Sequence, residues 1–244
     1  MKPHNFLSIV LLSFIFSGLL ANNPIKNKSA STEIPAVQTG EWEILFDGNG
    51  LDNWMGKTNH KPPSPGWKIE NGMLYMTGEG GDIVTKKKYG DFELVFEFKL
   101  TEEANSGIKY FVDKVVNEEN GKEMINGPEY QIIDDYNNKV VKKEPNGTKS
   151  AAAAYLLYPP KNKKLNPPGE WNNGKIIAKN GKVEHWLNGV KVVSYKRGSK
   201  DFLKRKAETK FKNDINYGEF DKGHIMLTDH NDLVYFRNMK IRKL

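Results

Sequence analysis

The chain has 244 residues, of which 38% are hydrophobic and 27% charged, and it contains 12 Phe, 10 Tyr and 5 Trp. This aromatic content excludes a disordered chain, and the overall polarity excludes a bundle of membrane helices, so a soluble globular protein is expected. The formal net charge is +7, and there is no Cys, which rules out disulfides and lipid attached to an N-terminal Cys.

Residues 1–21 have the layout of a secretory signal peptide, because Lys2 precedes a nearly unbroken apolar run that ends among small residues. The run is short for a membrane span and has no basic flank on its far side, although an uncleaved N-terminal anchor is the alternative. Residues 22–40 are rich in Asn, Ser, Pro and Lys and predict a flexible linker. We therefore expect a periplasmic or extracellular protein with one domain over residues 41–244 and no membrane span in the mature chain.

After Gly40, short apolar segments are divided by Gly, Asn, Asp and Pro, which is typical of a sheet protein with many turns. The clearest strand is 91–100, where Phe92, Leu94 and the apolar residues at every second position after them share one face. Further strands are expected at 107–112, 129–133, 152–158, 174–178, 182–187, 190–195, 225–229 and 234–241.

The Asn-Gly pairs at 180–181 and 188–189 predict tight hairpins, since both residue types tolerate a positive φ. One helix is expected from Ser199 to Phe211, with Ser199 as the N-cap and the apolar side chains Phe202, Leu203 and Phe211 partly turned inward. Many strands and one short helix favour an all-β fold in which two antiparallel sheets pack face to face.

Many Lys and Arg residues fall between 196 and 212, within and around the expected helix. This cluster fits the solvated face of an amphipathic helix, with docking to an anionic polymer as the alternative. Export disfavours nucleic acid as a partner. The sequence has no His-x-x-x-His or paired-Cys metal signature, no Gly-rich phosphate loop and no nucleophile elbow, so we expect neither a metal site nor a cofactor.

Strand parity directs two polar side chains to one side of the strand 129–133. Glu129 and Gln131 share one face, and Tyr130 and Ile132 share the opposite face, which is expected to be buried. Two hydrogen-bonding groups should therefore project side by side from a sheet.

The segment 224–230 behaves in the same way. Its apolar residues Ile225 and Leu227 are expected inside, so Met226, Thr228 and His230 should line the other surface, which makes His230 a reachable imidazole.

In the strand 182–187, Trp186 shares a side with the polar residues, whereas His185 falls with the apolar ones and is expected to be a core histidine rather than a catalyst. An open face that carries Glu129, Gln131 and His230, flanked by aromatic rings such as Trp171 or Trp186, would suit sugars. Rings cover the apolar faces of a pyranose, while amides and carboxylates bind its hydroxyls.

A longer ordered set of short motifs resembles the 3-keto-disaccharide hydrolase family over roughly residues 40–244. The set comprises Trp42, Phe46-Asp47-Gly48, Leu51-Asp52-Asn53-Trp54, Trp67-Lys68-Ile69-Glu70-Asn71-Gly72, Asp82-Ile83-Val84-Thr85, Tyr89-Gly90-Asp91-Phe92-Glu93-Leu94, Asn105-Ser106-Gly107-Ile108, Glu129-Tyr130-Gln131-Ile132-Ile133-Asp134, Glu170-Trp171-Asn172, His185-Trp186-Leu187-Asn188-Gly189 and Phe236-Arg237-Asn238.

The resemblance implies a concanavalin A-like jelly-roll sandwich that is exported and cleaves glycosides oxidised to a ketone at C3. One departure occurs where family members have Leu-Gln-Asp-His-Gly and this chain has Leu227-Thr228-Asp229-His230-Asn231. The missing Gln would remove one sugar contact.

Such a substrate can react by elimination and addition of water, which requires a base, an oxyanion stabiliser and an acid. We expect Glu129 or His230 to be the base, with the other or Asp134 as the acid. Asp134 could equally cap a turn, and the Asn105 segment could equally fix the start of a strand. The residues expected to bind substrate are Gln131, Asn105, Lys109, Trp171, Trp186 and Asp229.

The expected partner is a carbohydrate, and the sequence carries no signal for an oligomeric state. A non-catalytic carbohydrate-binding module is the competing function, because the same sandwich serves both roles.

Overall fold

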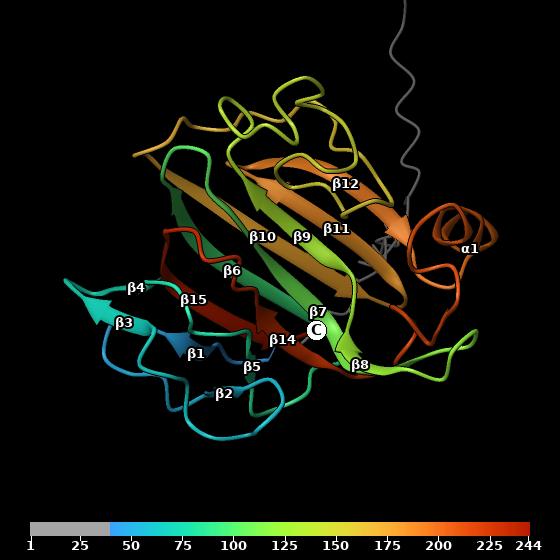
Figure 1. Ribbon diagram of the computed structural model, residues 1–244, viewed down its shortest axis with the longest axis horizontal. Helices are drawn as coiled ribbons and strands as arrows, with labels where there is room; N and C mark the ends of the chain where they lie inside the picture. The colour runs from blue at the N-terminus through green and yellow to red at the C-terminus, as the bar shows by residue number, and fades with distance from the viewer. Residues whose placement is uncertain (1–39) are drawn as a thin grey trace, which may run out of the picture. The chain divides into compact units, whose positions relative to one another are not determined.

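A strict alternation of buried and half-exposed side chains along β6 (Phe92–Leu100) places this strand in the first of two sheets. The structure, a computed structural model, describes residues 40–244. Its two sheets are antiparallel throughout and pack against each other as a sandwich, which confirms the predicted jelly-roll class (Figure 1). The predicted signal peptide and almost all of the predicted linker lie outside the described residues.

The first sheet has eight strands in the order β12-β11-β10-β6-β15-β4-β3, and β1 pairs with β15 beside this path. Its other strands are β1 (Glu43–Phe46), β3 (Trp67–Glu70), β4 (Met73–Met76), β10 (Trp171–Lys179), β11 (Lys182–Leu187), β12 (Val190–Lys196) and β15 (Val234–Lys243).

The second sheet has seven strands in the order β13-β7-β14-β5-β2, and both β8 and β9 pair with β7. Its strands are β2 (Trp54–Gly56), β5 (Ile83–Thr85), β7 (Asn105–Asn117), β8 (Glu123–Asn126), β9 (Glu129–Ile133), β13 (Asp214–Ile215) and β14 (His224–Leu227).

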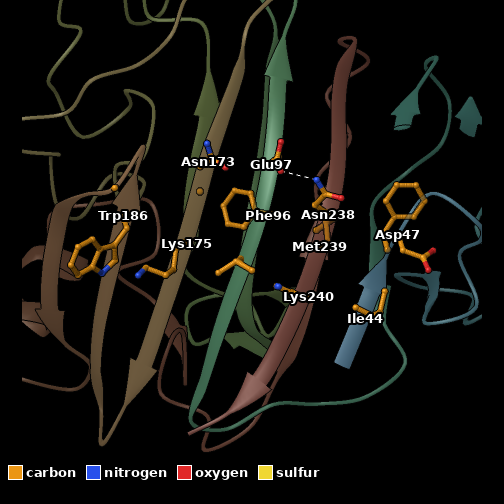
Figure 2. A pocket seen from close by; sticks show the side chains of 14 residues that line it. Ile44, Asp47, Phe96, Glu97, Asn173, Lys175, Trp186, Asn238, Met239 and Lys240 are labelled. Atoms are coloured by element: carbon orange, nitrogen blue, oxygen red, sulfur yellow. Dashed lines mark hydrogen bonds between the residues drawn. The ribbon is translucent and has the colours of Figure 1, made fainter. Parts of the chain in front are cut away.

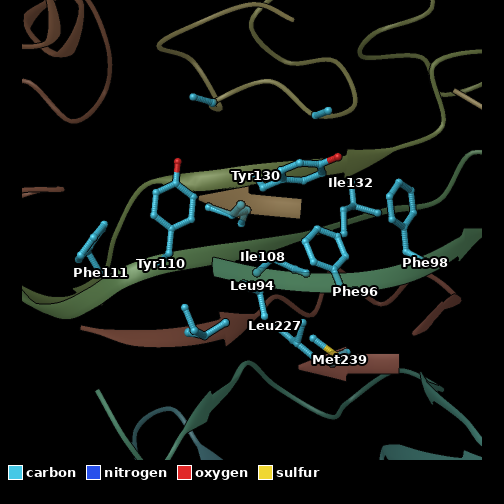
Figure 3. Close-up of a cluster of buried hydrophobic side chains, with 14 of the residues drawn as sticks. Leu94, Phe96, Phe98, Ile108, Tyr110, Phe111, Tyr130, Ile132, Leu227 and Met239 are labelled. Atoms are coloured by element: carbon cyan, nitrogen blue, oxygen red, sulfur yellow. The ribbon is translucent and has the colours of Figure 1, made fainter. Parts of the chain in front are cut away.

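Aromatic rings fill the space between the two sheets (Figure 3). The ring of Phe96 on β6 meets the ring of Tyr130 on β9 edge to face, with centroids 5.3 Å apart. Phe92 packs on Phe111 of β7 at 5.7 Å. Because these rings join opposite layers, they hold together strands that are distant in the sequence.

His185 lies in this core, as predicted, and connects the two sheets. It is fully buried, and its Nε2 lies 2.7 Å from the hydroxyl of Tyr110 on β7. Its Nδ1 lies 3.0 Å from the carbonyl oxygen of Ala152. Burial lowers the pKa of His185 to about 4, because a charged imidazole would lose its hydration there.

Both predicted hairpins are present. Asn180 and Gly181 join β10 to β11 with φ values of 51° and 77°, and Asn188 and Gly189 join β11 to β12 with values of 47° and 81°. A positive φ at both central residues is the geometry that matches the twist of a two-residue hairpin.

The predicted helix forms as α1 (Lys200–Ala207), with the Ser199 hydroxyl accepting a hydrogen bond from the Phe202 amide at 3.2 Å. It ends before the predicted Phe211, and Leu203 is exposed rather than turned inward. Within residues 40–244, no helix has the length and apolar character needed to cross a membrane.

The predicted strand 152–158 is wrong. Ala152 and Leu156 both have a φ of 63°, which breaks an extended conformation. The segment instead runs along the edge of β9 as a series of turns. The Ala152 amide donates to the Gln131 carbonyl at 2.8 Å, and the Tyr155 amide donates to the Glu129 carbonyl at 3.0 Å. The edge strand is thereby covered.

Candidate functional site

The outer face of the second sheet carries Glu129 at one end of a row of side chains that crosses five strands. The row follows from the strand registers, in which Glu129 is opposite Lys109, Lys109 is opposite Met226, and Met226 is opposite Val84, which in turn is opposite Met55. Val84 and Met226 belong to a small apolar cluster outside the main core. The row therefore has charged side chains, Glu129 and Lys109, at one end and apolar side chains along the rest.

Glu129 is recessed into this face. Only 6% of the residue is exposed, and the backbone of residues 152–155 forms hydrogen bonds along the edge of its strand, β9. Its carboxylate lies over Gly107, where the Cβ of any larger residue would lie 2.0 Å from Glu129 Oε1. Glycine at position 107 therefore leaves the space that the Glu129 carboxylate occupies. The Oε1 atom is shielded from solvent and has no hydrogen-bond partner within residues 40–244.

Burial raises the pKa of the Glu129 carboxyl group above its ordinary value, because the carboxylate loses its hydration. The positive charges of Lys109, His230 and Lys210 partly offset this rise, and the negative charge of Asp82 adds to it. A carboxyl group with a raised pKa and a free oxygen holds a proton more tightly than an ordinary carboxyl group and has an atom available to transfer it, which is the property of a general acid or base.

Gln131 and Asn105 are brought together beside Glu129. The Gln131 Nε2 donates to Asn105 Oδ1 at 3.2 Å, which leaves the side-chain oxygen of Gln131 and the side-chain nitrogen of Asn105 without partners among the described residues. Asn105 is the first residue of β7, so it also begins a strand, in line with the alternative prediction. Gln131 is only 4% exposed, so the predicted open polar face is in fact largely covered at this point.

Lys109 projects from β7 next to Glu129, and its Nζ donates to Asn126 Oδ1 at 3.0 Å. This hydrogen bond fixes the position of a cation beside the carboxylate. His230 follows β14 and is exposed, as predicted, and its charge acts on Glu129.

The side chains of the two residues that precede His230 form hydrogen bonds with backbone groups. Asp229 accepts hydrogen bonds from the amides of Gly81 at 2.6 Å and Asn231 at 2.7 Å, so both of its oxygens are engaged. Thr228, which stands where the family has Gln, is buried, and its hydroxyl donates to the Gly107 carbonyl at 3.3 Å. These bonds hold the loop that carries His230.

Asp134 occupies the structural position that the sequence left as an alternative to catalysis. It is fully buried and accepts hydrogen bonds from the amides of Glu103 and Tyr136, each at 2.9 Å. The Asn137 side chain donates to it at 2.8 Å. A carboxylate with these partners caps a turn, in line with the alternative prediction for this residue.

Trp171 and Trp186 do not flank Glu129, which corrects the predicted cluster. Trp171 is paired with Lys99 and Trp186 with Lys175, so both tryptophans lie on the outer face of the first sheet, across the core from Glu129. Parity within a strand gives the correct face of each residue, but it carries no information about which sheet the strand joins.

Two further features near Glu129 were not predicted. Asp82 forms an ion pair with Lys57, with Oδ2 and Nζ 2.5 Å apart, and it accepts the Asp229 amide at 2.9 Å. Burial raises the pKa of Tyr155, and the charge of Glu129 adds to this rise. No local pattern marks either feature, because both depend on loops that meet only in the folded chain.

Within residues 40–244, no three His, Cys, Asp or Glu side chains are grouped as a metal ion would require.

Comparisons with known proteins agree on one family. The sequence profile of the 3-keto-alpha-glucoside-1,2-lyase-like domain matches residues 41–242. A protein of Bacteroides thetaiotaomicron named 3-keto-disaccharide hydrolase is 30% identical over 239 residues, which cover 88% of this chain and 82% of that protein.

Two crystal structures from Parabacteroides distasonis, both named as candidate glycosyl hydrolases, are also similar. One is 35% identical with a TM-score of 0.73, and the match covers 84% of this chain and 94% of the other. The second is 28% identical with a TM-score of 0.60, and the match covers 84% of this chain and the whole of the other. The chain belongs to the 3-keto-alpha-glucoside-1,2-lyase-like domain family.

Proposed function

We propose that this chain is a carbohydrate-active enzyme that cleaves glycosides carrying a ketone at C3, with Glu129 as a proton-transferring residue. The observation that carries the proposal is the recessed carboxyl group of Glu129, which has a raised pKa and an unpartnered oxygen over Gly107. Membership of the family and the names of its relatives support the substrate class.

The reaction would proceed by elimination and then addition of water. A base removes the hydrogen at C2, which the neighbouring ketone makes acidic, and the electron pair forms an enolate. The enolate expels the oxygen at C1, which takes a proton from an acid and leaves as an alcohol. Water then adds at C1 and a proton returns to C2, so the net change is hydrolysis of one glycosidic bond.

The described residues suit these steps. Glu129 and His230 form the acid and base pair, with the raised pKa of Glu129 favouring it as the group that gains and returns the proton. Lys109, held by Asn126, stabilises the negative charge of the enolate oxygen. The free amide groups of Gln131 and Asn105 position sugar hydroxyls.

Export is part of the same proposal. The apolar run within residues 1–21 supports it, since a signal peptide would deliver the enzyme to the periplasm or the medium. Cell fractionation of the full chain, followed by determination of its mature N-terminus, tests this point. Retention of the intact chain in the cytoplasm would contradict it.

The test of the catalytic proposal is the variant Glu129→Gln, assayed by release of the aglycone from a 3-keto-glucoside. We expect kcat to fall by about 10²–10⁴-fold, because the amide keeps the shape of the side chain but cannot exchange a proton. We expect the thermal midpoint to rise at pH 7, because the variant removes a carboxyl group whose charged form is disfavoured by burial.

Two further variants test whether the effect is specific to the Glu129 carboxylate. Glu123→Gln, at an exposed position on strand β8 of the same sheet, should keep full activity. Gly107→Ala should displace the Glu129 carboxylate and lower kcat more than it raises KM. Equal cleavage of the unoxidised parent glycoside would reject the elimination route, and an active Glu129→Gln variant would reject the residue assignment.

A further inference from the structure

A groove of about 550 Å³ lies on the outer face of the first sheet, on the opposite side of the molecule's core from Glu129 (Figure 2). Its volume is within the range typical of sites for small ligands. It crosses β11, β10, β6, β15 and β1, and it contains none of the residues proposed above for catalysis.

Two parallel rows of side chains build the groove. Strand registers place Trp186, Lys175, Val95, Lys240 and Ile44 side by side across the five strands.

The second row lies two residues further along the strands, about 7 Å away. It contains Asn173 opposite Glu97, and Asn238, whose Nδ2 donates to Glu97 Oε1 at 2.7 Å. Asp47 completes this side of the groove. One row therefore carries apolar and aromatic side chains with two lysines between them, and the other row is polar (Figure 2).

The sheet is deformed around this groove in three places. The register shifts between Ile44 and Phe46 on β1, between Arg237 and Lys240 on β15, and between His185 and Trp186 on β11. Asn238 adopts a φ of 51° at the second shift. Such bulges cost regular pairing and redirect side chains, and they are enriched next to functional sites.

The chemistry of the groove favours a neutral sugar chain over an acidic one. Lys175 already lies 4.4 Å from the centre of the Trp186 ring, and Lys240 lies 4.8 Å from that of Trp42. The carboxylates of Glu97 and Asp47 balance these two lysines in the lining of the groove, and Glu97 also forms an ion pair with Arg237 at 2.7 Å, so the lining residues carry no net charge that would attract an anionic polymer. The side-chain amide of Asn173 has no hydrogen-bond partner within residues 40–244 and is exposed.

We propose that this groove is a second carbohydrate-binding site that takes a short neutral oligosaccharide. The apolar row, with Trp186 at its end, covers the C–H faces of the sugar rings. The polar row, with Asn173, Glu97 and Asn238, binds their hydroxyl groups. The site would hold a glycan chain without cleaving it, while the Glu129 face acts on a different substrate molecule or a different part of the chain.

Isothermal titration of the whole chain with cellohexaose, laminarihexaose and maltohexaose tests the proposal. At least one of these neutral glucans should bind, and both Trp186→Ala and Asn173→Ala should weaken that binding about tenfold or more. Tyr235→Ala is the matched control, because Tyr235 lies opposite Lys99 and Tyr75 on the same face of the same sheet but does not line the groove. It should bind like the parent chain.

Three results would overturn the proposal. The first is no binding of any of the three glucans. The second is binding that survives both groove substitutions but disappears in Glu129→Gln, which would locate the sugar on the other face. The third is preference for an acidic oligogalacturonate over all three neutral chains. Retained glucan binding by an inactive Glu129→Gln variant would support two separate sites, whatever the reaction at Glu129 proves to be.

Discussion

Glu129 and His185 are both buried titratable residues, yet the fold gives them different surroundings. One oxygen of the Glu129 carboxylate has no hydrogen-bond partner within the described chain. Burial therefore raises the pKa of the carboxyl group while leaving this oxygen free. Both ring nitrogens of His185 have partners, the Tyr110 hydroxyl and the Ala152 carbonyl. The first arrangement leaves a group available for chemistry, and the second fixes a group that joins the two sheets.

His185 should therefore make the stability of the fold depend on pH. Its pKa is about 4 in the folded chain, against 6.5 for an ordinary solvated histidine, so the unfolded chain binds the proton more tightly. The stability is fully present above pH 6.5 and is lost as the pH falls toward 4, by about 3 kcal/mol over the window. Urea denaturation at pH values between 7 and 4.5 measures this free energy.

His185→Phe should be less stable than the parent at pH 7, because it loses two hydrogen bonds, and should show a smaller decline toward low pH. His60→Asn is the control, since His60 is exposed and Asn tolerates its φ of 54°. An unchanged decline in His185→Phe would mean that other groups cause the pH dependence.

At the scale of elements, the turn-rich segment 151–158 covers the edge of β9, the strand that carries Glu129. A buried ion pair anchors the beginning of this segment. The Asp135 and Lys163 side chains are each 6% exposed, with Oδ2 and Nζ 2.5 Å apart. Asp135 Oδ1 also accepts the Ala151 amide at 2.9 Å, and Lys163 reaches the Ala151 carbonyl at 3.4 Å. The pair therefore holds both backbone groups of one residue.

Lys163→Met should cost about 3–5 kcal/mol of unfolding free energy, because it leaves the Asp135 charge buried without its partner. The double variant Asp135→Asn with Lys163→Met should recover part of this loss, since no charge is then buried. Urea denaturation measures both values. Amide hydrogen exchange at Tyr155 should speed up most in the single variant, and equal exchange in all three proteins would show that the pair does not anchor the segment.

Local signals predicted elements better than they predicted the site. The bounds of β9 and β11 were predicted correctly, because alternation and an Asn-Gly turn are both properties of neighbouring residues. Glu129, Gln131 and Asn105 came together because two paired strands carry them. Trp186 was assigned to the wrong sheet, since the pairing partner of a strand is set by contacts far away in the sequence.

The burial of Glu129 also could not be predicted from the sequence. The segment that covers the edge of its strand turns at Ala152 and Leu156 through a positive φ, and neither residue type indicates such a backbone. The continuous apolar run there suggested a strand, and tertiary packing overrode it. Long-range placement thus explains both the misplaced tryptophans and the recessed carboxylate.

The whole molecule depends on its last strand. β15 runs through the middle of the first sheet, where it pairs with β6, β4 and β1. Four of its apolar side chains, at positions 234, 236, 239 and 241, are at most 2% exposed. Their burial contributes about 6–12 kcal/mol at about 1.5–3 kcal/mol each, which is comparable with the total stability of an ordinary domain.

A chain that ends at Asp232 should therefore fail to fold, because its first sheet would be split between β6 and β4. We expect its circular dichroism spectrum to lack the cooperative thermal transition of the full chain. Addition of a peptide with residues 233–244 should restore the transition, and a peptide with Phe236 and Ile241 replaced by Ser should not. A cooperative transition in the shortened chain alone, within a few degrees of the full chain, would show that the remaining strands already form a stable sandwich.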